Sequence, residues 1–219
     1  MKNKLKRYGE NKLNNLILEN GKKLFNKTKG KWSKIFKNNN PIYLELGCGN
    51  GEYTVYNSMH NPNINFIGID IKGSRIWKGA TFLKELNSKN AFFLRIQIEE
   101  IDKYFNNNEI DEILITFPDP RPKESDIKKR LTSIEFLLRY HKILKNNGKI
   151  KLKTDDLKLF EFSVECIKKL NFKNIELTRN LYNSKKHQEI KKIQTKYEKK
   201  FINQGRSIKY LKCTKLDFN

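Results

Sequence analysis

The segment that most constrains the fold of this chain spans residues 42–51 and reads Ile-Tyr-Leu-Glu-Leu-Gly-Cys-Gly-Asn-Gly. An apolar run ends there in three glycines at alternate positions, and a helix-like pattern begins at Glu52. Glycine has no Cβ, so such a turn can adopt positive φ values and let a ligand approach the backbone closely. The segment therefore predicts a buried strand, a tight ligand-binding turn and a helix.

Two acidic residues accompany this loop. Glu45 lies two residues before Gly47, and Asp70 ends a second apolar run over 64–70. A carboxylate at the end of the second strand is the position from which nucleotide-binding folds hold ribose hydroxyls. The Gly-x-Gly-x-Gly spacing differs from the Gly-x-Gly-x-x-Gly of dinucleotide sites. An ordinary strand-to-helix turn remains the alternative interpretation.

Strand-like and helix-like patterns alternate along the rest of the chain. Strands are predicted over 42–46, 64–70, 91–98, 109–117, 149–153, 175–177 and 207–216. Helices are predicted over 52–60, 74–86, 99–105, 132–144, 156–170 and 186–203. This alternation is typical of an α/β fold with a seven-stranded, mostly parallel sheet and helices on both faces. Such sheets bind ligands at the carboxyl ends of their strands.

The charge of the chain indicates a polyanionic partner. With 46 Lys and Arg against 24 Asp and Glu, the net charge is +22. Nucleic acid is the natural partner, although the joint abundance of Lys, Asn and Ile favours compositional drift as a partial cause. Residues 1–40 predict a basic N-terminal arm or helix before one domain over 41–219. A solvated arm and an arm that clamps nucleic acid or covers a ligand are both left open.

Cysteine and histidine usage favours a cytoplasmic protein without a metal. The three cysteines are far apart and odd in number, so they predict neither a disulfide framework nor a Cys-x-x-Cys metal site. The three histidines show no ligand spacing. No apolar stretch approaches the roughly 18 residues of a membrane span, and the basic N-terminus lacks the apolar core of a secretory signal. We therefore expect no metal and no membrane partner.

A proline-rich turn follows the predicted fourth strand. Residues 117–123 read Phe-Pro-Asp-Pro-Arg-Pro-Lys, and a basic run follows at 128–130. The prolines stiffen the turn around one carboxylate, Asp119, and present Lys123 shortly after it. A rigidly held acid at the mouth of a sheet suits a positioning role in catalysis. A proline-rich surface loop with a solvated Asp is the alternative.

These motifs together resemble a known family. The Gly loop with Glu45 and Asp70 resembles the first two motifs of class I S-adenosylmethionine-dependent methyltransferases, which have a Rossmann-like fold. The Phe-Pro-Asp-Pro turn and the Lys-Lys-Arg-Leu-Thr run over 128–132 resemble bacterial single-subunit tRNA (guanine-N7)-methyltransferases. Lys-Thr-Asp at 153–155 and Thr-Lys-Tyr-Glu at 195–198 follow in the family's order. The resemblance covers roughly residues 40–216.

The resemblance implies methyl transfer from S-adenosyl-L-methionine to N7 of a guanosine in the variable loop of tRNA. It implies that Asp119 is catalytic. The cofactor-binding residues would be Glu45, Gly47, Gly49, Asp70, Gln97 and Asp119. The substrate-binding residues would be Lys123, Asp155, Thr195, Lys196, Tyr197 and Glu198. The RNA-contacting residues would be Ser125, Asp126, Ile127, Lys128, Lys129 and Arg130. Both a monomer and a homodimer are compatible with the sequence.

Two departures from the family and two rival functions remain. Gln97 stands where the family usually has an Asp near the adenine, and Arg121 stands where it commonly has a Trp. One rival is a methyltransferase for an exocyclic amine of RNA or DNA, but residues 119–122 lack the second consecutive proline and the aromatic residue of that class. The other rival is a non-catalytic RNA-binding module on the same fold.

Overall fold

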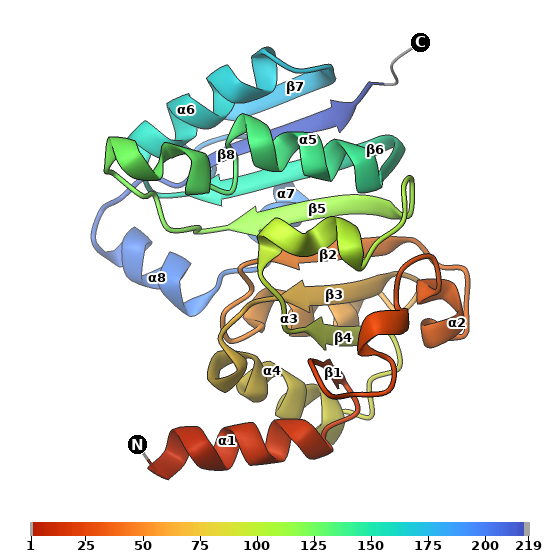
Figure 1. Cartoon of the computed structure of the whole chain (residues 1–219). Coiled ribbons are helices and arrows are strands. Elements are labelled where there is room, and N and C mark those ends of the chain that lie inside the picture. The colour runs from red at the N-terminus through yellow and green to blue at the C-terminus, as the bar shows by residue number, and fades with distance from the viewer. Residues whose placement is uncertain (1, 217–219) are drawn as a thin grey trace. The chain divides into compact units, whose positions relative to one another are not determined.

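The computed structural model describes residues 2–216, and the chain forms two compact units, Met1–Ile110 and Asp111–Asn219 (Figure 1). The first unit contains α1 (Lys2–Leu13), β1 (Ile17–Leu18), η1 (Phe25–Lys27), α2 (Trp32–Phe36), β2 (Ile42–Leu46), α3 (Glu52–His60), β3 (Asn65–Ile69), α4 (Gly73–Glu85), β4 (Ala91–Leu94) and η2 (Ile98–Lys103). The second contains β5 (Ile110–Thr116), η3 (Glu124–Lys129), α5 (Ile134–Ile143), β6 (Leu144–Thr154), α6 (Leu157–Lys168), β7 (Phe172–Thr178), α7 (Gln188–Lys191), α8 (Lys196–Asn203) and β8 (Lys209–Lys215).

The strands of the first unit are parallel and run in the order β1-β4-β3-β2. Their register pairs Leu46 with Ile69, and Ile69 with Leu94. The carboxyl ends of β2, β3 and β4 therefore meet at one edge. The Gly loop and Asp70 follow directly from two of these ends, so the sheet itself brings the two predicted binding elements to the same place.

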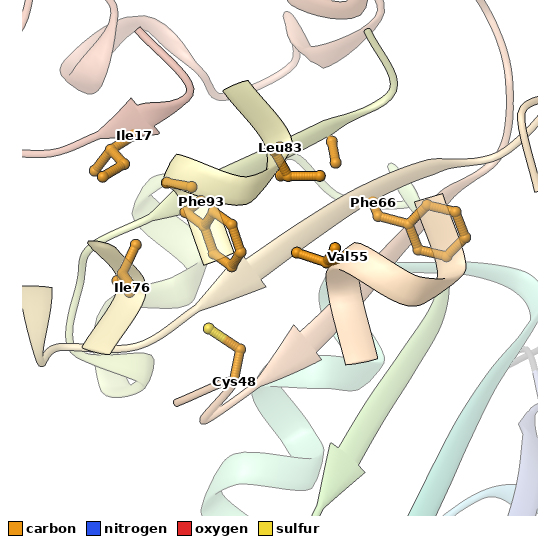
Figure 2. Close-up of a cluster of buried hydrophobic side chains, with 9 residues drawn as sticks. Ile17, Cys48, Val55, Phe66, Ile76, Leu83 and Phe93 are labelled. Carbon is orange, nitrogen blue, oxygen red and sulfur yellow. The ribbon is translucent and has the colours of Figure 1, made fainter. Parts of the chain in front are cut away.

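Helices α3 and α4 cover one face of this sheet. Figure 2 shows the apolar cluster between them, in which Val55 of α3 and Ile76 of α4 pack with Phe66 and Phe93 of the strands. Phe66 and Phe93 are almost fully buried. The alternating pattern of each strand sends these rings to the helix-covered face, and full burial of such side chains contributes about 1.5–3 kcal/mol each.

Helix α2 covers the other face, and an i, i+4 aromatic pair explains its position. Trp32 and Phe36 lie on one side of the helix, with ring centroids 5.9 Å apart. Trp32 stacks on Phe105 at 5.3 Å, and its indole N–H donates to the Tyr104 carbonyl at 3.0 Å. Phe36 meets the edge of Phe92 at 5.1 Å. The strands of the first unit are thus covered by helices on both faces.

The N-terminal arm is folded, and contact with nucleic acid or with a ligand remains a prediction. Helix α1 lies along α4 (Figure 1). The buried Asn11 amide donates to the Gly73 carbonyl at 2.9 Å, and the Trp77 indole donates to the Glu10 carboxylate at 2.5 Å. The Arg7 guanidinium lies 4.7 Å above the Trp77 ring centroid. These contacts join the polar face of α1 to the outer surface of α4.

The strands of the second unit run in the order β5-β6-β8-β7, with β8 antiparallel to both of its neighbours. Helix α6 packs on β6 and β8. It starts at Asp156, whose carboxylate caps the helix by accepting from the Leu159 N–H at 2.7 Å. A register shift between Lys173 and Glu176 interrupts the pairing of β7 with β8.

The fold class predicted from the sequence is confirmed, although several elements differ in detail. Within residues 2–216 there are eight strands, because Ile17 and Leu18 form a two-residue strand paired with β4. The predicted single helix over 186–203 is wrong. The structure has two helices there, separated by residues 192–195, and the Thr195 hydroxyl caps α8 by accepting from the Glu198 N–H. A capping Thr favours a helix start over a helix interior.

Candidate active site

The glycine loop adopts the backbone conformation that its composition predicts. Gly47, Gly49 and Gly51 have φ values of 69°, 55° and 72°, the left-handed region that costs other residues energy. A Cβ added to Gly49 would meet no other atom within 4 Å. A Cβ added to Gly51 would come within 2.3 Å of the Phe93 ring. Gly49 thus offers room for a ligand, and Gly51 lets α3 pack closely on the sheet.

Glu45 is a buried residue that ties the loop to the helix after it. Its carboxylate accepts from the Thr54 backbone N–H at 2.9 Å and from the Thr54 hydroxyl at 2.5 Å. Thr54 lies in the first turn of α3, where backbone N–H groups lack helical partners and the helix dipole favours an anion. Glu45 therefore stabilises the start of α3 and fixes the path of the loop between β2 and α3.

Asp70 ties the same loop to the second strand. Its two carboxylate oxygens accept from the Gly49 N–H at 2.9 Å and from the Lys72 N–H at 2.8 Å. A carboxylate offers about four acceptor sites, so these bonds leave Asp70 able to accept from ribose hydroxyls. The first unit thus gathers four predicted cofactor-binding residues, which are Glu45, Gly47, Gly49 and Asp70.

Two other side chains near this edge behave differently. Gln97 is exposed and lies three residues beyond the end of β4, immediately before η2, and its side chain does not cap η2. Cys48 is buried in the loop, and burial, with the Glu45 and Asp70 carboxylates adding to it, raises the pKa of its thiol well above its usual value. Cys48 is therefore held as an uncharged thiol, which is a poor nucleophile.

The proline-rich turn holds Asp119 through its own backbone. Phe117 and Arg121 both have φ of 47°, an uncommon conformation for residues other than glycine. Asp119 is exposed, and its Oδ1 accepts from the Arg121 N–H at 3.1 Å. At the start of the turn, the Phe117 N–H donates to the Lys153 carbonyl at 2.8 Å. The turn thus leaves β5 in a defined direction and presents a carboxylate to solvent.

Arg130 supports this turn. Its Nε and Nη2 both donate to the Arg121 carbonyl, at 3.2 and 3.1 Å. Its guanidinium also lies 4.5 Å from the centroid of the Phe162 ring on α6. A planar guanidinium can make this fork and this stacking contact at once, whereas a lysine cannot. Arg130 was predicted to contact RNA, and in this structure its guanidinium is engaged with the protein.

The remaining predicted RNA contacts lie on and around η3. Ser125, Ile127 and Lys128 are exposed. Asp126 and Lys129 form an ion pair at 2.6 Å, and the hydrogen bond from Lys129 lowers the pKa of the Asp126 carboxyl. A surface pair of this kind contributes little to stability. Lys129 can turn toward a phosphate at low cost, and we retain the RNA-contacting role of this segment as a prediction.

The predicted nucleoside-binding residues divide into exposed and buried groups. Lys123, Lys196 and Tyr197 are exposed, with 56% of Tyr197 accessible to solvent. Asp155 accepts from Arg206 at 2.7 Å, so its carboxylate already has a cationic partner. Thr195 is buried as the cap of α8, and Glu198 is fully buried.

Glu198 belongs to an interior polar cluster that the sequence did not reveal. Its carboxylate accepts from Lys153 at 2.5 and 2.7 Å and from the Tyr182 hydroxyl at 2.7 Å. Burial, followed by the interactions with Glu198, raises the pKa of Tyr182 above its usual range. Lys153 looks like an exposed strand residue because it alternates in phase with Lys149 and Lys151. No sequence signal indicated that Lys153, unlike the other two, is buried.

A cavity of about 360 Å³ lies elsewhere in the second unit, beside α7. It is lined by Lys149, Lys151, His187, Gln188, Glu189, Ile190, Tyr210 and Lys212. Two of its lysines are already neutralised, Lys151 by Glu112 and Lys212 by Glu176, each at 2.7 Å. This balance of charge gives the cavity no clear preference for an anion.

Within residues 2–216, no group of three or more His, Cys, Asp or Glu side chains is arranged to hold a metal ion. None of the helices in the same range has the length and apolar character needed to cross a membrane.

Comparison with known proteins identifies relatives over most of the chain. Residues 39–211 match the model of a family described as "Putative methyltransferase". The tRNA (guanine-N(7)-)-methyltransferase of Cytophaga hutchinsonii is 39% identical over 95% of this chain and 96% of its own length. The enzyme of the same name from Christiangramia forsetii is 43% identical over 96% of this chain and 97% of its own. The enzyme of the same name from Bacteroides fragilis is 47% identical over 84% of this chain and 73% of its own length.

Solved structures of methyltransferases have a similar fold. The 16S rRNA methyltransferase KamB matches with a TM-score of 0.65 at 12% identity, over 86% of this chain and 94% of its own. An antibiotic-related methyltransferase matches with a TM-score of 0.59 at 17% identity, over 84% of this chain and 92% of its own. At such low identity these matches establish the class I methyltransferase fold alone.

Proposed function

Because this chain belongs to the tRNA (guanine-N7)-methyltransferase family, we propose that it transfers a methyl group from S-adenosyl-L-methionine to N7 of a guanosine in tRNA. The observation that carries the proposal is the similarity to the tRNA (guanine-N(7)-)-methyltransferase of Christiangramia forsetii. The two sequences are 43% identical over 96% of this chain and 97% of the relative. Such coverage includes the Gly loop, the proline-rich turn and the C-terminal motifs together.

Three features of the first unit support the binding of S-adenosylmethionine there. The open space at Gly49 allows close approach of a ligand to the loop backbone. Asp70 is held by two backbone N–H groups and keeps acceptor capacity for the ribose hydroxyls. A carboxylate such as that of Glu45 suits a cationic sulfonium better than it suits a pyrophosphate. We propose that these residues hold the cofactor, which supplies an electrophilic methyl group, and that Gln97 contacts its adenine end.

The chemistry of N7 determines what the protein must supply. N7 of guanine has an in-plane lone pair and no proton, so the enzyme needs no general base to expose it. The ring becomes cationic as it gains the methyl group. A fixed carboxylate stabilises that developing charge, and we propose Asp119 for this role because its turn is stiff and its side chain is exposed. Orientation of the base supplies the remainder of the rate enhancement.

We propose that tRNA is the substrate and that the enzyme acts in the cytoplasm. A net charge of +22 favours a polyanionic substrate. Lys123, Lys196 and Tyr197 are exposed and suitable for a nucleoside, with the Tyr197 ring as a stacking surface. A base in a folded RNA must first be exposed, at a cost of a few kcal/mol. The exposed lysines around η3 would offset part of that cost through phosphate contacts.

The role of Asp119 is tested by Asp119→Asn, which keeps the size of the side chain and removes its charge. We expect kcat on tRNA to fall by about 10²-fold or more, in line with the loss of one electrostatic stabiliser. The dissociation constant for S-adenosylmethionine, measured by calorimetry, should change much less. Equal losses in cofactor binding and turnover would assign Asp119 to ground-state binding instead.

A further inference from the structure

Lys153 and Glu198 form a fully buried ion pair in the second unit. Both side chains have 0% of their surface accessible, and Lys153 Nζ lies 2.5 Å from Glu198 Oε1. Charged side chains are almost never buried to this extent unless they are paired. Lys153 is the penultimate residue of β6, and Glu198 lies in the first turn of α8. The pair therefore joins the end of a central strand to the start of a helix 45 residues later in the chain.

The same amine also binds the segment between these elements. Lys153 Nζ donates to the carbonyls of Ile190 and Ile193, at 3.3 and 3.2 Å. Ile190 lies in α7, and Ile193 lies in the connection from α7 to α8. Their carbonyls are positioned near the end of a short helix, where intrahelical partners are lacking. One lysine thus holds α7, the connection and α8.

Glu198 has two further anchors. Tyr182 donates to its Oε1 at 2.7 Å, and its backbone N–H donates to the Thr195 hydroxyl at 3.3 Å. With its carboxylate enclosed by Lys153 and Tyr182, Glu198 has no accessible surface to offer a nucleoside. Its neighbours Lys196 and Tyr197 point outward and are exposed. The cluster therefore fixes the backbone from which those two side chains project.

We propose that Lys153 is a positioning residue for nucleoside recognition, and that Glu198 acts as its buried anchor and does not contact the substrate. The proposal rests on the proposed function, because it assigns Lys196 and Tyr197 to the nucleoside. Lys153 immediately precedes the Thr154-Asp155 pair, and its carbonyl accepts the N–H of Phe117 at the start of the proline-rich turn. One residue thus orders three segments predicted to meet the substrate.

The test is a double-mutant cycle in the full chain with Lys153→Met, Glu198→Gln and the double variant. Lys153→Met leaves the Glu198 carboxylate buried without a cation, so kcat/KM for tRNA should fall at least tenfold. Amide hydrogen exchange over 188–203 should accelerate at least tenfold. The dissociation constant for S-adenosylmethionine should stay within twofold. Glu198→Gln should lower kcat/KM by less than Lys153→Met does. The amide oxygen of Gln and the carbonyls of Ile190 and Ile193 can still accept from Lys153.

The double variant decides between anchoring and substrate contact. The double variant removes both charges. Its kcat/KM for tRNA should therefore be at least fivefold higher than that of Lys153→Met. If Glu198 touched the nucleoside, Glu198→Gln alone would abolish turnover, exchange over 188–203 would stay unchanged, and the double variant would show no recovery. That result would overturn the proposal.

Two controls separate loss of this buried pair from nonspecific effects of substitution and from misfolding. Arg179→Met breaks an exposed ion pair with Glu161, 2.8 Å long in the same unit, and should change neither exchange over 188–203 nor activity. If Lys153→Met does not fold, Glu198→Gln still decides, since faster exchange confined to 188–203 supports anchoring and unchanged exchange contradicts it. Exchange and cofactor binding need no tRNA, so failure of the proposed substrate would be seen separately.

Discussion

At the scale of single residues, spacing predicted the glycine loop but not the interior charges. Glu45 and Asp70 were predictable because a strand end followed by glycines constrains both position and chemistry. Lys153 and Glu198 were not, because a lysine in a charge-rich strand and a glutamate in a helical pattern ordinarily face water. Only the folded chain shows that they meet each other without solvent.

Gly51→Ala should destabilise the first unit. The new Cβ would come within 2.3 Å of the Phe93 ring, at a residue with φ of 72°. Overpacking costs about 1–3 kcal/mol, and the left-handed backbone adds roughly 1–2 kcal/mol. Gly9→Ala in α1 is the matched control, because nothing lies within 4 Å of its Cβ, and it should be neutral or slightly stabilising. Urea unfolding of both variants checks this, and equal midpoints would contradict it.

Arg130→Lys should impair catalysis without weakening cofactor binding. The lysine keeps the charge but loses the fork onto the Arg121 carbonyl and the stacking on Phe162. Since Arg121 donates to Asp119, we expect kcat to fall by about tenfold, at an approximate cost of 1.4 kcal/mol. Lys128→Ala, on an exposed neighbour, should raise KM for tRNA instead. The account of the turn fails if Arg130→Lys changes only KM.

His187 should make the protein sensitive to mild acid. Burial lowers the pKa of its imidazole below the ordinary value of 6.5. The folded state therefore binds fewer protons than the unfolded state in that window, so stability is full above pH 6.5 and decreases as pH falls through the lowered pKa. His187→Asn tolerates the same φ of 62° and should flatten the dependence of Tm on pH between about 7 and 5. An unchanged slope would contradict this assignment.

At the scale of elements, apolar periodicity located most helices and strands, and its failures have local causes. Strand β1 was missed because two residues, Ile17 and Leu18, are too short to show a period. The break between α7 and α8 was missed because apolar spacing continues across it, whereas α7 ends at Lys191 and the Thr195 hydroxyl caps the start of α8. Capping residues carry information that periodicity alone does not.

Gly73→Ala should loosen α1 from α4. A Cβ there would lie 2.8 Å from the Tyr8 ring and 3.0 Å from Arg95 Nε, so both side chains would have to shift and the contact between the helices would weaken. We expect faster hydrogen exchange over 2–13 and earlier proteolysis at its lysines, while exchange in β2 and β3 stays slow. If α1 remains protected in the variant, the close approach of the two helices does not determine its docking.

At the scale of the whole molecule, composition predicted the class of partner, and the order of motifs predicted the family. Charge alone left compositional drift as a partial explanation. Residues 39–211 match a methyltransferase family, and the relatives aligned over nearly the whole chain are named tRNA methyltransferases, which agrees with the predicted nucleic-acid partner. What composition could not supply is the identity of the lysines that meet phosphate, because an exposed lysine has the same sequence signature in either role.

Binding of tRNA should therefore depend strongly on salt. The logarithm of the dissociation constant should rise linearly with the logarithm of salt concentration, since each neutralised phosphate releases counterions. Lys128→Ala should reduce that slope by about one if its amine meets a phosphate. Filter binding across a salt series measures both. A slope near zero for the parent protein would exclude phosphate contacts as the main source of affinity.

The most direct test of the whole account is labelled methyl transfer from S-adenosylmethionine onto unmodified tRNA transcripts, with the product mapped by chemical cleavage at N7-methylguanosine. We predict incorporation at a single guanosine in the variable loop, and its loss in Asp119→Ala. Methylation at an exocyclic amine, or at a guanosine elsewhere in the tRNA, would contradict the proposed substrate while leaving the fold and the cofactor intact.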